Sequence, residues 1–326
     1  MKAFKIAQPQ TIEQVTSLFA EKRDGYFLMA GGTDILDEIK NGTVEPEVVV
    51  DLKSIPNLSY IRKEKDGVHV GAMTTLAELA ENSIIKSDYP GLLQAALSLA
   101  TPQLRNVGTV GGNLCQRPRC WYYRDPEVLC RKKGGTRCFA FKGRNKYHAI
   151  IGGGVCYIVY PSDLAPALIS LEAEISINSP KKDKTIPLQD FYVLPQVNAR
   201  KENILEPGEV VREVKIPLAK SGEKSAYIKL KERGTWDFAL VSAAVKANVS
   251  GGVFNDIKII LGGVAPIPWR LEKAENLIKG KKASEEMLRE AAREALKEAK
   301  PLEENGYKVE LAEVAIYRAA LSLLQV

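Results

Sequence analysis

The chain has 326 residues, 45% of them hydrophobic, and a formal net charge of +6. This length suits two or three packed units, and no apolar run approaches the roughly 20 residues that a membrane-spanning helix needs. Residues 1–10 lack the apolar core of a secretory signal, which predicts a cytoplasmic chain without a membrane span. Export attached to a partner that carries its own signal is also compatible with the sequence.

Residues 1–55 have the pattern of a small α/β unit. Apolar residues at helical spacing over 11–22, with Thr11 as a candidate N-cap, predict a first helix. The short apolar run 26–30 predicts a buried strand. A second helix is expected over 35–40 and a further strand over 48–52.

A second unit, residues 56–176, is expected to combine helices with strands on either side of an Asp66-Gly67 turn. Its predicted elements are strands at 58–62, 68–70 and 156–160 and helices that begin at Thr74, Pro90 and Asp163.

The third unit is expected over residues 177–326, after a polar segment at 178–184 that has the composition of a linker. Period-two patterns predict antiparallel strands, and two C-terminal segments have helical periodicity. These elements are strands at 210–216, 225–230 and 257–261 and helices at 283–300 and 309–324. The predicted fold class is therefore α+β.

The positive charge is concentrated in one segment. Residues 116–150 contain ten basic and only two acidic side chains, a net charge of +8, so the remainder of the chain is slightly acidic. A solvated loop would explain this pattern, as would compensation of an anionic metal cluster or docking of an acidic partner.

The same segment holds most of the cysteines. Cys120, Cys130, Cys138 and Cys156 follow the spacing C-x9-C-x7-C-x17-C, whereas Cys115 ends a glycine turn and is not expected to be a ligand. Four thiolates can bind a zinc ion or a [4Fe–4S] cluster. The spacing has neither the C-x2-C pairs of structural zinc sites nor the ferredoxin run, so it predicts metal binding and leaves the metal undecided. Disulfides and inert buried thiols are the alternatives.

Two glycine turns offer backbone N–H groups without a hindering Cβ atom. One is Ala30-Gly31-Gly32-Thr33, and the other lies within residues 108–113. Such turns can hold a pyrophosphate, although a Gly-Gly pair alone is more often a plain tight turn. Neither turn has the spacing of a dinucleotide fingerprint or a P-loop.

Several motifs, taken together and in order, resemble a known family. They are Ala30-Gly31-Gly32-Thr33-Asp34, Arg105-Asn106-Val107-Gly108-Thr109-Val110-Gly111-Gly112-Asn113-Leu114, Pro161-Ser162-Asp163-Leu164-Ala165-Pro166, and Lys229-Leu230-Lys231-Glu232-Arg233-Gly234. This set resembles the FAD-binding subunit of molybdenum hydroxylases, such as the medium subunit of carbon monoxide dehydrogenase and the flavin domain of xanthine dehydrogenase. The resemblance implies a two-part FAD-binding fold of the vanillyl-alcohol-oxidase/PCMH type, over residues 1–55 and 56–176, and a C-terminal α+β domain.

The long segment between Leu114 and Pro161 departs from most of that family, in which only a few residues separate the two motifs. A four-cysteine segment here, at about residues 116–156, resembles the branch with an extra [4Fe–4S] cluster. That branch includes the β subunit of 4-hydroxybenzoyl-CoA reductase and the flavin subunit of bacterial aldehyde oxidoreductases. We call residues 116–156 the insert.

The resemblance also implies roles for individual residues. The expected pyrophosphate and flavin contacts are Ala30, Gly31, Gly32, Thr33, Asp34 and Ile35, with a second wall from Ala100, Thr109, Gly111, Gly112 and Asn113. Asp163 is expected to hydrogen-bond FAD, and Lys229 is expected near the isoalloxazine ring. Asp163 could equally be a helix N-cap, and Lys229 a solvated strand lysine. The expected cluster ligands are Cys120, Cys130, Cys138 and Cys156.

The function expected from this resemblance is electron transfer, since no nucleophile or acid–base set is evident. The implied partners are a molybdopterin-containing large subunit, a [2Fe–2S] small subunit and an acidic ferredoxin-like protein, without nucleic acid. Two alternatives are an iron–sulfur or zinc module that binds nucleic acid, because Trp121, Tyr122 and Tyr123 lie among the basic residues, and a stand-alone FAD oxidase. The two cofactor sites are expected to be separable, so Cys130→Ser should lose iron but keep FAD.

Overall fold

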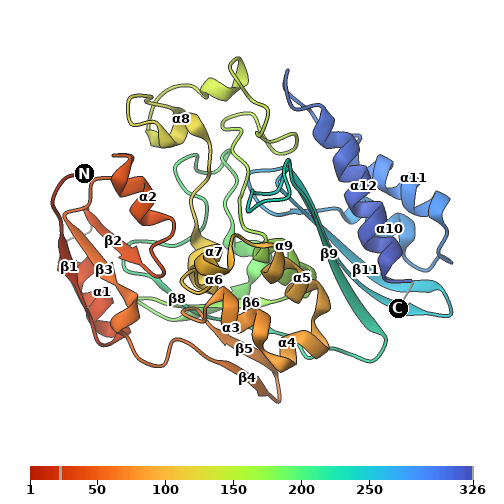
Figure 1. Ribbon diagram of the computed structural model, residues 1–326, viewed down its shortest axis with the longest axis horizontal. Helices are drawn as coiled ribbons and strands as arrows, with labels where there is room; N and C mark the ends of the chain where they lie inside the picture. The colour runs from red at the N-terminus through yellow and green to blue at the C-terminus, as the bar shows by residue number, and fades with distance from the viewer. Residues whose placement is uncertain (22–23, 325–326) are drawn as a thin grey trace.

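A computed structural model of the chain, which describes residues 1–21 and 24–324, contains three β-sheets (Figure 1). The N-terminal sheet is parallel, in the order β1 (Lys5–Ala7), β3 (Val48–Asp51), β2 (Tyr26–Met29). Helices α1 (Ile12–Glu21) and α2 (Ile35–Lys40) accompany it, and β2 and α2 are separated by the first glycine turn. The predicted end of the first helix, Lys22, lies outside the described residues.

The middle sheet has five strands, and all of its neighbouring strands are antiparallel. Its order is β4 (Ile61–Glu64), β5 (Gly67–Gly71), β8 (Val210–Ile216), β6 (Glu174–Asn178), β7 (Lys184–Pro187). Both β7 and β8 pair with β6, which contains residue 176. The domain boundary expected at residue 176 therefore falls inside this sheet. The polar segment 178–184 is a hairpin connection between β6 and β7 and not a linker between domains.

Helices of the middle unit cover this sheet with a common hydrophobic core. They are α3 (Leu76–Glu81), α4 (Ser83–Asp88), α5 (Pro90–Ser98), α7 (Val110–Cys115) and α9 (Leu164–Ser170), whereas the short helix α6 (Pro102–Arg105) contributes no residue to this core. Thr75 begins α3 with a capping box, in which its hydroxyl accepts from the Glu78 N–H and the Glu78 carboxylate accepts from the Thr75 N–H.

The C-terminal sheet is antiparallel, in the order β12 (Trp269–Arg270), β11 (Val253–Gly262), β10 (Val241–Ser250), β9 (Glu223–Leu230). One face packs on α10 (Glu272–Ile278), α11 (Glu285–Leu296) and α12 (Tyr307–Ser322), as Figure 1 shows. The opposite face, which includes Tyr227 and Ala244, joins the core of the middle unit. The architecture confirms the predicted α+β class with a C-terminal antiparallel sheet.

Two local predictions are wrong. Residues 156–160 form no strand, because their backbone bonds go to separate segments: the Ala149 N–H donates to the Tyr157 carbonyl, and the Tyr160 N–H donates to Ala265. The second glycine turn is the first turn of helix α7, with Thr109 as its N-cap.

The insert lies at the top of Figure 1, above α7, and contains the short helix α8 (Trp121–Arg124). Two 3-10 turns follow, at Arg131–Lys133 and Phe139–Phe141. Among the described residues, no helix has the length and apolar character needed to cross a bilayer.

Candidate functional site

Two cavities lie where the units meet the insert. The first, of about 390 Å³, is lined by the turn after β2 and by the start of α7, and it includes the predicted site residues of both glycine motifs. The second, of about 680 Å³, is lined by Asp163, by Cys120 and Trp121 of the insert, and by a loop at residues 232–240. Arg119 lines both cavities. Ala100 and Lys229 line neither of them.

The turn after β2 presents unused hydrogen-bond donors to the first cavity. Within the described residues, the backbone N–H groups of Gly31, Gly32, Thr33 and Asp34 have no acceptor. Gly32 has a φ of 78°, which favours glycine, and a Cβ atom on Gly31 would overlap the Val107 carbonyl oxygen. Unpaired N–H groups on such a turn form a cradle for an anion such as a pyrophosphate.

The N–H groups of the second glycine motif are already occupied. Gly111 donates to the Ala72 carbonyl at 2.8 Å, and Gly112 donates to Thr109 Oγ1 at 3.1 Å. The second motif therefore offers the cavity no free donors from these two glycines, but it does affect the shape of the cavity. A Cβ atom added to Gly112 would lie 3.6 Å from the Cβ atom of Ala30 on the facing turn.

Asp163, at the edge of the second cavity, belongs to a buried hydrogen-bond network. Its carboxylate accepts from Tyr227 Oη at 2.5 Å and pairs with Lys229 Nζ at 2.7 Å. Lys229 also donates to the Ser98 carbonyl, close to Ala100, whose φ is 43°. Burial and the Asp163 charge together raise the pKa of Tyr227 well above its ordinary value, so the phenol keeps its proton and donates. Asp163 starts α9 without a side-chain capping bond, so its carboxylate serves this network instead.

Asp34 contacts the insert. Its carboxylate accepts from the Arg117 N–H at 2.6 Å and from Arg124 Nη2 at 2.6 Å, and it pairs with Arg119 Nη1 at 2.9 Å. Residue Glu38, buried on α2, accepts from Tyr123 Oη at 2.6 Å. The first glycine turn and α2 are therefore docked on residues 117–124.

The four predicted cysteine ligands converge on one place in the insert. The neighbouring thiol of Cys156 lowers the pKa of Cys138, and Cys120 interacts electrostatically with Cys130 and Cys138. A single tetrahedral zinc ion, with Zn–S bonds of about 2.3 Å, requires its sulfur ligands to lie within 4.8 Å of one another. No three of these four sulfurs are that close. Cys115 packs against the middle core, and burial raises its pKa to about 12.

The insert is held by all three units. Lys132, whose side chain is 1% exposed, pairs with Glu202 at 2.5 Å, and Arg117 pairs with the same carboxylate at 3.0 Å. On the C-terminal side, Asn305 Nδ2 donates to the His148 carbonyl at 3.0 Å. Among the ten basic residues at 116–150, five form ion pairs within the chain: Arg117, Arg119, Arg124, Lys132 and Lys146.

Family models match nearly the whole chain. Residues 2–219 match the FAD binding domain in molybdopterin dehydrogenase, and residues 225–323 match the CO dehydrogenase flavoprotein C-terminal domain. The chain belongs to the molybdopterin dehydrogenase FAD-binding family.

Several relatives align with this chain over nearly their full lengths. The chain is 34% identical to the aldehyde oxidoreductase FAD-binding subunit PaoB of Escherichia coli (strain K12), over 96% of this chain and 95% of that protein. It is 28% identical to the carbon monoxide dehydrogenase medium chain of Hydrogenophaga pseudoflava, over 97% and 95%. A solved structure of the Hydrogenophaga pseudoflava carbon monoxide dehydrogenase that lacks the Mo-pyranopterin moiety superimposes with a TM-score of 0.79 at 27% identity, covering 99% and 98% of the two chains. The chain is therefore an oxidoreductase subunit of this family.

Membership of the family does not indicate every residue that builds the site. Sequence reasoning missed Tyr227 and Glu202 and treated Arg119 and Arg124 only as basic charge. The position of Tyr227 carries a signal, because it lies two residues before Lys229 on one strand, and alternate residues of a strand share a face. Glu202 is distant in sequence from both of its cationic partners and carries no such signal.

A buried lysine at the start of α12 supports the end of the insert. Lys308 Nζ donates to the carbonyls of Tyr147 and Gly263 at 2.9 and 2.8 Å, and burial lowers its pKa to about 7. The unfolded chain therefore binds more protons than the folded chain above pH 7, and stability should rise with pH from 7 toward the ordinary lysine range.

Urea unfolding at pH 7 and pH 9 tests this pH dependence. Relative to the natural chain, Lys308→Met should show a smaller gain in the free energy of unfolding between the two pH values, since it lacks the titrating amine. An equal gain in both proteins would contradict this origin of the pH dependence.

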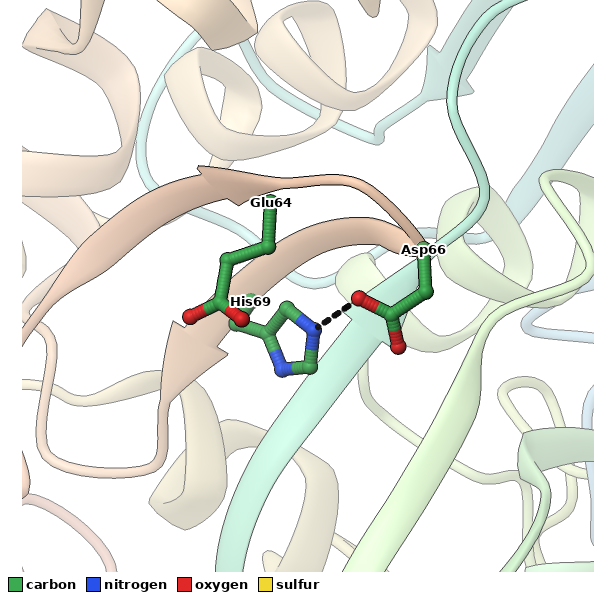
Figure 2. Close-up of side chains that lie close together, drawn as sticks. All are labelled: Glu64, Asp66 and His69. Atoms are coloured by element: carbon green, nitrogen blue, oxygen red, sulfur yellow. Dashed lines mark hydrogen bonds and ion pairs between the residues drawn. The ribbon is translucent and has the colours of Figure 1, made fainter.

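A second group of metal-ligating side chains lies on the hairpin of β4 and β5. Figure 2 shows Glu64, Asp66 and His69, whose ligand atoms lie within 4.8 Å of one another. Both ring nitrogens of His69 are engaged, with Asp66 at 3.1 Å and with Glu213 at 3.2 Å. Lys215 lies 3.5 Å from Asp66 and competes for its charge, so this group is explained by its own hydrogen bonds and ion pairs.

Proposed function

We propose that the chain is the FAD- and [4Fe–4S]-containing electron-transfer subunit of a multi-subunit molybdenum hydroxylase. When bound, FAD supplies two-electron chemistry and the iron–sulfur cluster supplies one-electron transfer. The observation that carries the proposal is the adjacency of two cavities: the first contains the free backbone donors, the second is lined by Cys120 of the insert, and Arg119 lines both.

For FAD, we assign the pyrophosphate to the N–H groups of residues 31–34. Ala30, Ile35, Thr109, Gly111, Gly112 and Asn113 would form the walls of this part of the site. We place the flavin ring in the second cavity, which reaches Asp163. There Asp163 would accept from the ring, while Tyr227 and Lys229 hold the Asp163 carboxylate in place behind the cavity wall.

For the insert, we assign the four cysteines to a polynuclear cluster and not to a single zinc ion, because no three of their sulfurs lie within 4.8 Å of one another. In a [4Fe–4S] cluster each thiolate binds its own iron, so the sulfurs can be farther apart than around one ion. Buried Lys132 interacts electrostatically with Cys156 and would offset the negative charge of the cluster.

A nucleic-acid-binding module is less well supported. Five of the ten basic side chains that suggested it are engaged in ion pairs inside the chain, and Tyr123 is buried against Glu38. The basic side chains of the insert that form no ion pair with another described residue could bind a small acidic protein. Arg131, Arg137 and Lys142 are exposed, as are the nearby residues in sequence Leu129 and Phe141, whose side chains are 65% and 53% exposed. We assign this face to an acidic, ferredoxin-like protein.

The other proposed partners are a molybdopterin-containing large subunit and a [2Fe–2S] small subunit; the terms FAD-binding subunit and medium chain in the names of the relatives support an assembly with further subunits. The substrate of the whole enzyme would be selected by the large subunit. Location in the cytoplasm stays a prediction from the sequence.

Anaerobic purification with flavin and metal analysis tests the proposal. The natural chain should hold one FAD and about four iron atoms. Cys138→Ser should lose the iron, whereas Cys115→Ser is a matched control, since Cys115 packs in the middle core, and should keep it. Zinc in place of iron, or iron retained by Cys138→Ser, would contradict the cluster; a chain without flavin would contradict the proposed function as a whole.

A further inference from the structure

The carboxylate of Asp34 lies next to the backbone N–H groups that we assign to an anionic pyrophosphate. Asp34 lies in the run of four residues whose unpaired N–H groups line the first cavity, and a negative charge there would repel a pyrophosphate. Its side chain is neutralised by guanidinium groups of Arg119 at 2.9 Å and Arg124 at 2.6 Å, both of which belong to the insert.

These contacts occupy the carboxylate on both oxygens. Arg124 Nη2 and Arg119 Nη1 meet Oδ1, while the Arg117 N–H donates to Oδ2. The Arg124 side chain is itself fixed, because its Nε donates to the Pro118 carbonyl at 2.9 Å and its Nη1 pairs with Asp37 at 3.1 Å. The arginine side chain is 10% exposed, so solvent screens the pair only weakly.

With the insert in place, the carboxylates of Asp34 and Asp37 are balanced by the guanidinium groups of Arg119 and Arg124, so this corner of the cavity is close to neutral. With the insert detached, the same corner would present two carboxylates without their cationic partners. The charge next to the N–H cradle is therefore negative only when the insert is detached.

We propose that Asp34 is a positioning residue that makes binding of a pyrophosphate-containing cofactor depend on a folded insert, through Arg119 and Arg124. This inference rests on the proposed FAD site and gives Asp34 a role other than direct contact with the cofactor. Because coupling between two sites is reciprocal, bound FAD stabilises the insert by the same factor by which the folded insert strengthens FAD binding. The two cofactor sites are then not separable, in contrast to the expectation from the sequence.

A double-mutant cycle measured on the full chain tests the proposal, with titration of flavin-free protein by FAD as the readout. Arg124→Gln should weaken FAD binding by about tenfold or more, since it removes a charge-assisted bond and leaves Asp34 partly uncompensated. In the Asp34→Asn background the same change should cost only about twofold, because no carboxylate remains to be neutralised.

The control is Arg144→Gln. Arg144 is an exposed arginine of the same insert that belongs neither to the proposed cofactor sites nor to the face assigned to a partner. The FAD affinity of this variant should equal that of the natural chain. Unchanged affinity in Arg124→Gln, or an equal loss in the natural and the Asp34→Asn backgrounds, would overturn the proposal.

Iron release to a chelator supplies a second readout, which simple misfolding of the insert would not reproduce. FAD should slow the release of iron from the natural chain, and this protection should be lost in Arg124→Gln. Equal protection in both proteins would overturn the coupling. A natural chain that binds no FAD would instead refute the proposed function, so the two failures are distinguishable.

Discussion

Replacing Gly31 by alanine should abolish FAD binding and lower the free energy of unfolding by about 3 kcal/mol. The added Cβ atom would overlap the Val107 carbonyl oxygen, which is backbone and cannot move away as a flexible side chain would. The first glycine turn would have to withdraw from the segment before α7, and the cavity between them would change shape. FAD titration and urea unfolding measure the two effects.

Gly306→Ala is the matched control, because a Cβ atom there meets nothing within 4 Å. It should leave both FAD affinity and stability close to those of the natural chain. Full FAD binding by Gly31→Ala would show that the close approach of the two motifs is not needed for the site.

Replacing Glu202 by glutamine should also lower the free energy of unfolding by about 3 kcal/mol. The change leaves Lys132 and Arg117 without their common carboxylate, and the Lys132 side chain is almost fully buried. A buried charge whose partner is removed costs far more than a surface pair. The insert should become the first segment cut in limited proteolysis.

Glu206→Gln provides the comparison for that result. Glu206 pairs with Lys201 at the surface, with side chains 64% and 31% exposed, so its loss should cost less than about 1 kcal/mol. Equal destabilisation by the two substitutions would mean that the ion pairs of Glu202 do not anchor the insert.

Local patterns were reliable where neighbouring residues determine the structure. The expected helix over 35–40 coincides with α2, and the strand over 210–216 coincides with β8. A strong N-cap at Thr75 and period-two alternation on β8 act within a few residues, so sequence alone indicates them.

Features that depend on distant segments could not be predicted in the same way. The 178–184 segment has linker composition, yet pairing of β6 with β7 makes it a hairpin connection. Backbone donors of Gly111 and Gly112 are used by Ala72 and Thr109, and no local pattern reveals the acceptor on Ala72. Asp34 matched a cofactor motif, but its arginine partners lie more than 80 residues away in sequence, in the insert.

A reductive titration of the purified natural chain under anaerobic conditions tests most directly whether one FAD and one four-iron cluster are present together. FAD takes up two electrons and a [4Fe–4S] cluster takes up one, so about three electrons per chain should be consumed, with bleaching of both flavin and cluster absorption. Consumption of about two electrons, with flavin bleaching alone, would contradict the presence of the cluster, and consumption of none would contradict both cofactors.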